Sequence, residues 1–439
     1  MRILYAVHHL PPRYTGGAEA RALRTARRMQ ALGHEAAMIC VEAIDQREPA
    51  VETRVEEGIP IRRLSFDHRS FPEATRWTYD NAFVEDRVTE LLNEQRPDVF
   101  HLISGYLMTA GAIRAAHRRG IPIVITLTDF WFLCPRITLL RGAGRVCPAP
   151  PPDPLGCVQC QAEASRRFSW PAQVAPQLTA QGWRQLGQRL PAVRAQALAI
   201  HDRRQVLSEA LALSQALICP SRFLRELFVE NGVAPEKLLL MRQGLAVPDQ
   251  QPPRRPADDV TVFGYSGQIK PHKGVDLIVA AGAALAARGY RFKIAIYGNA
   301  EEDRRYTESL KRRARAATWL EWRGTYTAHD AWTVLAGLDA ILVPSRWYEN
   351  SPNIILEAQA AGVPVIATEL GGMAELVRHE ENGLLFRLND AADLSRQMSR
   401  LLGDPGLLIG LRDCAPPVKT LDQEMAELLQ LYGQVIGRA

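Results

Sequence analysis

Two successive runs of alternating strand and helix signals constrain the fold of this chain more than any other feature of its sequence. The first run occupies residues 1–246 and the second residues 260–415. Short apolar segments such as Val99–Ile103 and Phe292–Tyr297 are bounded by turn or polar residues, as expected of strands buried on both faces of a parallel sheet. Strands that alternate with helices form right-handed crossovers. The pattern therefore predicts a doubly wound α/β sheet in each half.

The segment between the two runs is the clearest linker in the chain. It reads VPDQQPPRRPADD at residues 247–259, rich in proline and charge. We therefore expect an N-terminal domain at 1–246, a C-terminal domain at 260–415 and a last segment, 416–439, that contains a helix. A length of 439 residues with 47% hydrophobic and 23% charged residues is ordinary for a globular protein of two or three domains.

Charge and hydropathy narrow the range of partners. The net charge of +5 is small for this length, and no dense Lys/Arg tract indicates nucleic acid binding. No apolar run is long enough for a signal peptide or a membrane span, which predicts a cytoplasmic protein. Arginines and aromatic residues alternate in the predicted helical segment 163–213. They fit a solvated helix face better than a peripheral contact with the inner face of the membrane, which stays the alternative. The oligomeric state is left open.

The stretch from 339 to 376 carries the strongest functional signal. A buried strand is predicted at Ala340–Val343, followed by a loop that contains Glu349. Ser351 is then expected to cap a helix in which Pro352 is the first residue. The free backbone N–H groups and the positive dipole end at such a helix start suit a diphosphate.

The same stretch, PSRWYENSPNIILEAQAAGVPVIAT, resembles the donor-site signature of retaining family-4 glycosyltransferases, which have the GT-B fold. The resemblance implies that Glu349 contacts the donor sugar and that Glu357, spaced E-x7-E from it, contacts the ribose hydroxyls. It extends over nearly the whole chain. The donor-binding residues that it implies are Gly16, Gly17, Gln268, Lys273, Gly298, Arg323, Glu349, Asn350, Ser351, Asn353, Ile354 and Glu357.

The loop GQIKPHKGVD resembles the phosphate-binding loop of that family. Lys273 matches the family's lysine, which implies that it binds the donor diphosphate. Gln268 stands where the family usually has arginine, so one charge-assisted contact is missing unless Lys270 or His272 compensates.

In the first half, two positions carry the resemblance to the catalytic site. The pair Gly16 and Gly17 follows the first predicted strand, where such a pair borders the donor phosphates in the family. Asp129 matches the aspartate of a His-Asp pair that many relatives carry, and it is grouped with Glu349 as catalytic. Thr128 stands where the family's histidine contacts the donor sugar, so that role does not carry over.

A cysteine-rich insertion is predicted at about 130–165, in a loop without regular structure. Its four thiols are spaced C-x12-C-x9-C-x2-C, at Cys134, Cys147, Cys157 and Cys160. Four thiols that end in C-x-x-C match a structural all-cysteine zinc site, which would order the loop. The alternatives are an iron–sulfur cluster, a redox disulfide, or four unrelated buried thiols that bind nothing.

Together these features predict a GT-B protein: two doubly wound Rossmann-like domains that face a cleft. The resemblance alone implies that the last helix crosses back to the first domain. The predicted function is retaining transfer of a sugar from a nucleotide-diphosphate donor to a glycan or lipid-linked acceptor, as in polysaccharide biosynthesis. No D-x-D triplet occurs in the sequence, so a catalytic metal is not expected. The alternatives are a nucleotide-sugar epimerase or phosphorylase on the same fold, and a catalytically silent nucleotide-binding scaffold.

Overall fold

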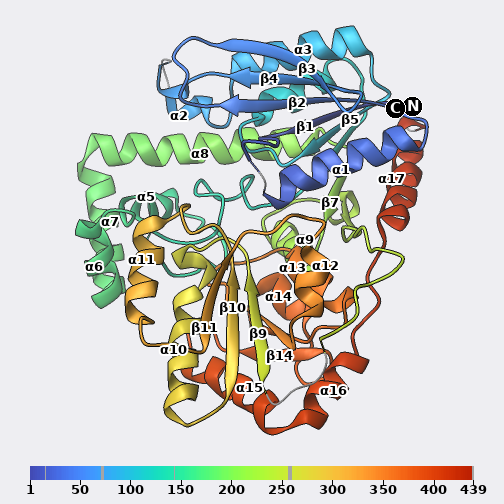
Figure 1. Ribbon diagram of the computed structural model, residues 1–439. Helices are drawn as coiled ribbons and strands as arrows, with labels where there is room; N and C mark the ends of the chain where they lie inside the picture. The colour runs from blue at the N-terminus through green and yellow to red at the C-terminus, as the bar shows by residue number, and fades with distance from the viewer. Residues whose placement is uncertain (15, 71–73, 143, 256–259, 438–439) are drawn as a thin grey trace. The chain divides into compact units, whose positions relative to one another are not determined.

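The chain forms two compact units in the computed structural model, which describes residues 1–14, 16–70, 74–142, 144–255 and 260–437 (Figure 1). Unit 1 comprises Met1–Arg242 together with the chain from Asp422 onward, and unit 2 comprises Gln243–Leu421. The last four residues of the predicted linker, 256–259, lie outside the described residues, as do 438 and 439 of the last segment.

Unit 1 is built on an eight-stranded sheet with the order β3-β4-β2-β1-β5-β6-β7-β8. All neighbouring strands are parallel except β3, which is antiparallel to β4. The strands are β1 (Arg2–Val7), β2 (Glu35–Ala43), β3 (Ala50–Glu56), β4 (Ile59–Ser65), β5 (Val99–Ile103), β6 (Ile123–Thr126), β7 (Ala216–Cys219) and β8 (Leu238–Leu240). The edge strand β3 was not predicted, because its side chains are nearly all exposed and its sequence lacks a buried-strand pattern.

Helices follow the strands of unit 1 in alternation. They are α1 (Gly17–Ala31), η1 (His68–Ser70), α2 (Ala74–Trp77), α3 (Ala82–Gln95), α4 (Thr109–His117), α5 (Pro154–Ala162), α6 (Arg166–Val174), α7 (Pro176–Arg189), α8 (Pro191–Ala212), α9 (Arg222–Glu230), η2 (Pro235–Lys237) and α17 (Leu421–Ile436). Helix α5 corrects the prediction that the cysteine-rich insertion lacks regular structure. Asp153 caps this helix by accepting from the backbone N–H of Leu155, and Pro154 occupies its first turn.

Helix α17 completes the core of unit 1. Figure 1 shows it beside α1, and the side chain of Arg21 donates to Glu424 from Nε at 3.1 Å and from Nη2 at 2.6 Å. Both side chains are buried. The hydroxyl of Tyr432, from α17, is 2.6 Å from His101 Nδ1 and 3.4 Å from the hydroxyl of Tyr5. This helix is therefore part of the first unit's interior.

Unit 2 has a six-stranded parallel sheet with the order β11-β10-β9-β12-β13-β14. The strands are β9 (Thr261–Ser266), β10 (Phe292–Tyr297), β11 (Leu320–Gly324), β12 (Ala340–Val343), β13 (Val365–Thr368) and β14 (Gly383–Phe386). Successive residues of β12 pack on opposite faces: Ala340 and Leu342 join one core cluster, and Ile341 and Val343 join the other. The prediction that this strand is buried on both faces is confirmed.

The helices of unit 2 cover the two faces of this sheet. They are η3 (Pro271–Lys273), α10 (Val275–Ala287), α11 (Arg304–Arg313), α12 (Ala331–Ala336), α13 (Asn353–Ala360), α14 (Gly371–Leu376), α15 (Ala391–Gly403) and α16 (Pro405–Asp413). Helices α10, α11, α15 and α16 contribute to one core cluster, and α12, α13 and α14 to the other. The strand order reverses between β9 and β12, and ligands of open α/β sheets bind at the carboxyl ends of strands at such a point. The loops after β9 and β12 are therefore where a site is expected.

Among the described residues, none of the helices combines the length and apolar character needed to cross a membrane.

Candidate active site

The loops after β9 and β12 bring together the two residues that the sequence analysis weighted most. Lys273 ends the short helix η3 after β9, and Glu349 lies in the loop after β12. Lys273 Nζ is 2.5 Å from Glu349 Oε1, and both side chains are less than one-fifth exposed. A cation and a carboxylate from separate segments of the chain thus meet at the carboxyl edge of the unit 2 sheet.

Glu349 accepts two further hydrogen bonds at the same oxygen. Trp347 Nε1 donates to Oε1 at 2.7 Å and Ser345 Oγ donates to it at 2.9 Å. Burial alone raises the pKa of Glu349, but the charge of Lys273 and these hydrogen bonds outweigh it and lower the pKa below its ordinary value. The carboxylate is therefore ionised at neutral pH and held in one orientation.

The indole of Trp347 packs against the cation on the facing loop. Lys273 Nζ lies 4.8 Å from its ring centre, and the imidazole of His272 lies 4.6 Å away by ring centroids. Burial, together with the charge of Lys273, lowers the pKa of His272 to about 4. His272 is therefore neutral near pH 7, so it does not replace the positive charge that Gln268 lacks.

Two glycines allow the backbones around this pair to approach closely. Gly274 begins α10 with φ of +73°, and a Cβ atom on it would lie 2.0 Å from the carbonyl oxygen of Pro344. A Cβ atom on Gly372 would lie 1.9 Å from the carbonyl oxygen of Asn350. The N–H of Gly372 donates to the carbonyl oxygen of Glu349 at 2.9 Å. Any other residue at either position would push the loop after β12 out of place.

The start of α13 differs from its prediction by one residue. Pro352, not Ser351, is the N-cap, and no side chain caps the helix. Gln243 contacts this region: its Nε2 donates to the carbonyl oxygen of Ser351 at 2.6 Å and to Asn353 Oδ1 at 3.1 Å. Glu357 is half-buried in the same helix, one turn after Asn353.

The remaining predicted donor residues of unit 2 lie on several elements: Gln268 and Gly298 in loops, Arg323 on β11 and Ile354 on α13. Gln268 is exposed, and its backbone carbonyl accepts from the hydroxyl of Tyr265 at 2.6 Å. Gly298 follows β10, and a Cβ atom there would lie 2.3 Å from the carbonyl oxygen of Gly267. Arg323 donates to Glu321, also on β11, and is more than half exposed. Ile354 packs against the core cluster of α12–α14. The side chains of Lys273 and Glu349 are thus in direct contact with each other, while these four residues contact other groups of unit 2.

Three residues of this site were missed in the sequence analysis. Ser345 and Trp347 stand in the quoted signature, PSRWYE, but nothing in their spacing shows that they orient Glu349. Gln243 lies just before the linker, more than 100 residues from its partners. No local pattern could have shown that contact.

The predicted residues of unit 1 lie at the carboxyl ends of its strands. Gly17 begins α1 and Gly16 is its N-cap, so the prediction of a helix start at the glycine pair is confirmed. Asp129, after β6, accepts from Ser104 Oγ at 2.6 Å, from the backbone N–H of Trp131 at 2.8 Å and from Thr128 Oγ1 at 3.3 Å. Asp129 thus links the segment after β5, through Ser104, to its own loop after β6 by hydrogen bonds.

The four cysteines of the insertion are free thiols that line one cavity of about 20 Å³, which is room for a single water-sized body. Among the described residues, however, no group of three or more His, Cys, Asp or Glu side chains is arranged to hold a metal ion. The zinc prediction is therefore not confirmed.

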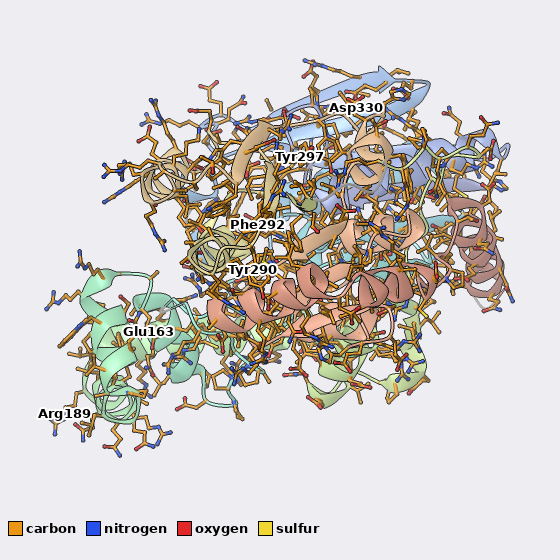
Figure 2. The ribbon with its side chains drawn as sticks, turned by 60° about the horizontal axis from the view of Figure 1, so that its bottom comes forward. Glu163, Arg189, Tyr290, Phe292, Tyr297 and Asp330 are labelled. Atoms are coloured by element: carbon orange, nitrogen blue, oxygen red, sulfur yellow. The ribbon has the colours of Figure 1, made fainter. Side chains whose placement is uncertain are left out.

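The insertion is constrained by other contacts. Arg141 pairs with Glu163, a buried residue labelled in Figure 2, through hydrogen bonds of 3.0 and 3.2 Å. Two of the thiols are engaged as well: Arg204 Nη2 donates to Cys157 Sγ at 3.3 Å, and Cys147 Sγ donates to the carbonyl oxygen of Ala149 at 3.0 Å. Burial raises the pKa of the Cys147 thiol to about 11. Hydrogen bonds and an ion pair thus supply the constraint that the sequence analysis assigned to a metal.

Comparison with known proteins places both units in one family. Residues 260–404 match the family model of glycosyl transferases group 1, and residues 16–149 match that of the glycosyl transferase 4-like domain. D-inositol 3-phosphate glycosyltransferase from Stackebrandtia nassauensis is 32% identical over 196 residues, which are 41% of this chain and 43% of that protein. The chain thus matches less than half of the length of this curated relative.

Solved structures show the same fold. HepE from Anabaena, in complex with UDP, superposes with a TM-score of 0.65 over 99% of this chain and 100% of that chain, at 13% identity. Sucrose-phosphate synthase from Thermosynechococcus elongatus gives a TM-score of 0.65 over 100% of both chains, at 17% identity. The fold is GT-B, and the chain belongs to the family-4 glycosyltransferases.

Proposed function

We propose that this protein transfers a sugar from a nucleotide-diphosphate donor to the hydroxyl of a glycan or lipid-linked acceptor, with retention at the anomeric carbon. The contact between Lys273 and Glu349 carries the proposal. It lies where the strand order of unit 2 reverses, within residues 260–404 that match the family model, in segments whose sequences resemble the donor-site motifs of the family. HepE, a structural relative, is described in complex with UDP, which makes UDP-sugars the first donors to test.

The chemistry requires that negative charge on the departing diphosphate be stabilised while positive charge develops on the sugar. Lys273 supplies a fixed cation, and the backbone N–H groups at the start of α13 supply dipoles directed at the same leaving group. Glu349, ionised and held by three donors, orients the sugar ring. We assign Glu349 to positioning and charge stabilisation, not to nucleophilic attack, and no step requires a metal.

The direct test is donor binding followed by turnover. We expect one of the UDP-, GDP- and ADP-sugars to raise the Tm, because a ligand that binds only the native state adds about 2.7 kcal/mol to the unfolding free energy at 100 times its Kd. The same nucleotide sugar should then release nucleoside diphosphate slowly in water and faster with an acceptor.

The outcomes separate the alternatives. Conversion of the donor to another nucleotide sugar without acceptor would indicate an epimerase. Release of a sugar phosphate when inorganic phosphate is added would indicate a phosphorylase. Binding without any turnover would indicate a silent scaffold, the alternative raised by Thr128 and Gln268. A protein that no nucleotide sugar stabilises would contradict the proposed donor site.

A structural zinc at the four-cysteine cavity stays a prediction that belongs to this proposal. The cavity has the size for one ion, but binding would require Cys147 and Cys157 to leave their present hydrogen-bond partners. We expect about one zinc per chain by elemental analysis of the purified protein, lost when Cys157→Ser and Cys160→Ser are combined. Stable, metal-free wild-type protein would remove zinc from the description.

A further inference from the structure

A pocket of about 730 Å³ lies within unit 1, at the carboxyl edge of its sheet. Four of the residues that line it follow shortly after strands: Ile44 after β2, Phe66 after β4, Tyr106 after β5 and Trp131 after β6. Strand β1 has β2 on one side and β5 on the other, so the strand order reverses here. Both the place and the volume are those of a small-molecule site.

The unit 1 pocket offers surfaces that suit a sugar. Aromatic side chains of Phe66, Trp77, Tyr106 and Trp131 line it, and aromatic faces pack against the C–H face of a sugar ring. The amides of Gln161 and Gln196 also line it and are joined by a hydrogen bond of 2.7 Å. Apolar faces with a few polar groups are typical of sites that bind small polar molecules.

Arg203, from α8, is the distinctive residue of this pocket. Its side chain is buried; Nη2 donates to the carbonyl oxygen of Trp131, and the guanidinium carbon lies 5.3 Å from the centre of the Trp131 ring. Nη1 is buried without a hydrogen-bond partner. The carboxylate of the neighbouring residue, Asp202, accepts a hydrogen bond from the hydroxyl of Tyr79 at 2.6 Å. Arg203 thus forms no ion pair with any carboxylate of the described residues.

Other buried arginines of the described chain show how unusual this is. Arg21 pairs with Glu424, and Arg63 pairs with Glu42 and with Glu56, each at 2.7 Å or less. Burial lowers the pKa of Arg203 to about 10, which still leaves it protonated at neutral pH. A buried charge without a counter-charge is costly, and an anionic ligand in the pocket would remove that cost.

We propose that the unit 1 pocket binds the acceptor of the reaction and that the acceptor carries an anionic group, phosphate or carboxylate, which is neutralised by Arg203. The aromatic walls hold the sugar ring, and the planar guanidinium donates to the anionic oxygens. This inference rests on the proposed transferase function and names the class of its acceptor as an anionic sugar. A neutral sugar of the same size would pack against the aromatic side chains but leave Arg203 without an ion-pair partner.

The test compares anionic and neutral probes with the purified full chain. Glucose 6-phosphate, glucuronate, inorganic phosphate and glucose are titrated at millimolar concentration while the Tm is followed. We expect at least one of the two anionic sugars to raise the Tm more than glucose does, and the two distinguish a phosphate from a carboxylate. Arg203→Gln should weaken that binding about tenfold or more. Arg203→Lys keeps the charge but not the planar guanidinium with its paired N–H donors, and should weaken the binding less.

Three controls separate this inference from the donor site and from misfolding. Lys273→Ala should remove stabilisation by nucleotide sugars and leave that by the anionic sugar, while Arg203→Gln should do the reverse. Arg189→Gln makes the same change of charge at an exposed residue on the end of α7, which Figure 2 shows pointing outward. This control should change neither the stabilisation by nucleotide sugars nor that by the anionic sugar. If the Tm of Arg203→Gln without ligand is close to that of the wild type, this variant is folded. If it is not folded, Arg203→Lys takes its place in the binding comparison. The proposal is overturned if neither anionic sugar exceeds glucose, or if the stabilisation survives loss of Arg203.

Discussion

Substitution of Lys273 by alanine is expected to lower the rate of nucleoside diphosphate release from the donor by about 10²–10³-fold, the cost typical of losing one fixed electrostatic stabiliser. The substitution removes the cation that is proposed to stabilise the leaving group and also leaves Glu349 without its ion-pair partner. Release of nucleoside diphosphate in water can be measured without knowing the acceptor. The binding of the free nucleotide should weaken as well, because the proposed role of Lys273 is to contact the diphosphate itself.

Glu349→Gln is expected to behave differently, and the difference tests the assigned roles. The amide keeps the size of the side chain but loses its charge, so turnover should fall while binding of the free nucleoside diphosphate stays close to that of the wild type. Lys293→Ala is the matched control, since Lys293 lies on β10 and is half exposed in an ion pair with Glu321. Undiminished turnover in either site variant, with the control unchanged, would show that the donor is held elsewhere.

The second large effect concerns stability. Glu424→Ala is expected to lower the free energy of unfolding by about 3–5 kcal/mol, because it leaves the charge of Arg21 buried without a partner. Urea unfolding measures this directly. Replacing both residues by leucine should cost less than the single change, since no uncompensated charge then remains in the interior.

The same two helices provide the control for this prediction. Arg28 of α1 pairs with Asp422 of α17, but Asp422 is about two-thirds exposed. Its substitution by alanine should cost no more than about 1 kcal/mol, as is usual for exposed ion pairs. Equal losses for Glu424→Ala and Asp422→Ala would show that burial of the Arg21 pair has no special weight.

The strands followed from the sequence because they depend on local patterns. Apolar runs such as Ile123–Thr126 are buried in full, and Gly16 and Gly17 stand at a helix start as expected. Lys273 and Glu349 were assigned to one site because their loops resemble two motifs of the family, and each follows a predicted strand of a parallel sheet, whose carboxyl ends meet at one edge. The direct contact between the two side chains was not predicted and is known only from the structure.

What could not be predicted depends on contacts between distant segments. Gln243 reaches Ser351 across more than 100 residues, and no local pattern in the sequence indicates this contact. The spacing of the four cysteines is compatible with a metal site, but spacing alone does not show that Arg141 and Glu163 already constrain the insertion. The unpaired charge of Arg203 is likewise invisible until its neighbours are known.

The position of α17 sets the order in which the protein can be completed during synthesis. Glu424 and Tyr432 fill the interior of unit 1, yet the ribosome makes them only after every residue of unit 2. Domains usually fold as they emerge, the first one first. Here Arg21 and Tyr5 must wait for a segment translated some 400 residues later, so a nascent chain that stalls within unit 2 presents an unfinished first unit to chaperones and proteases.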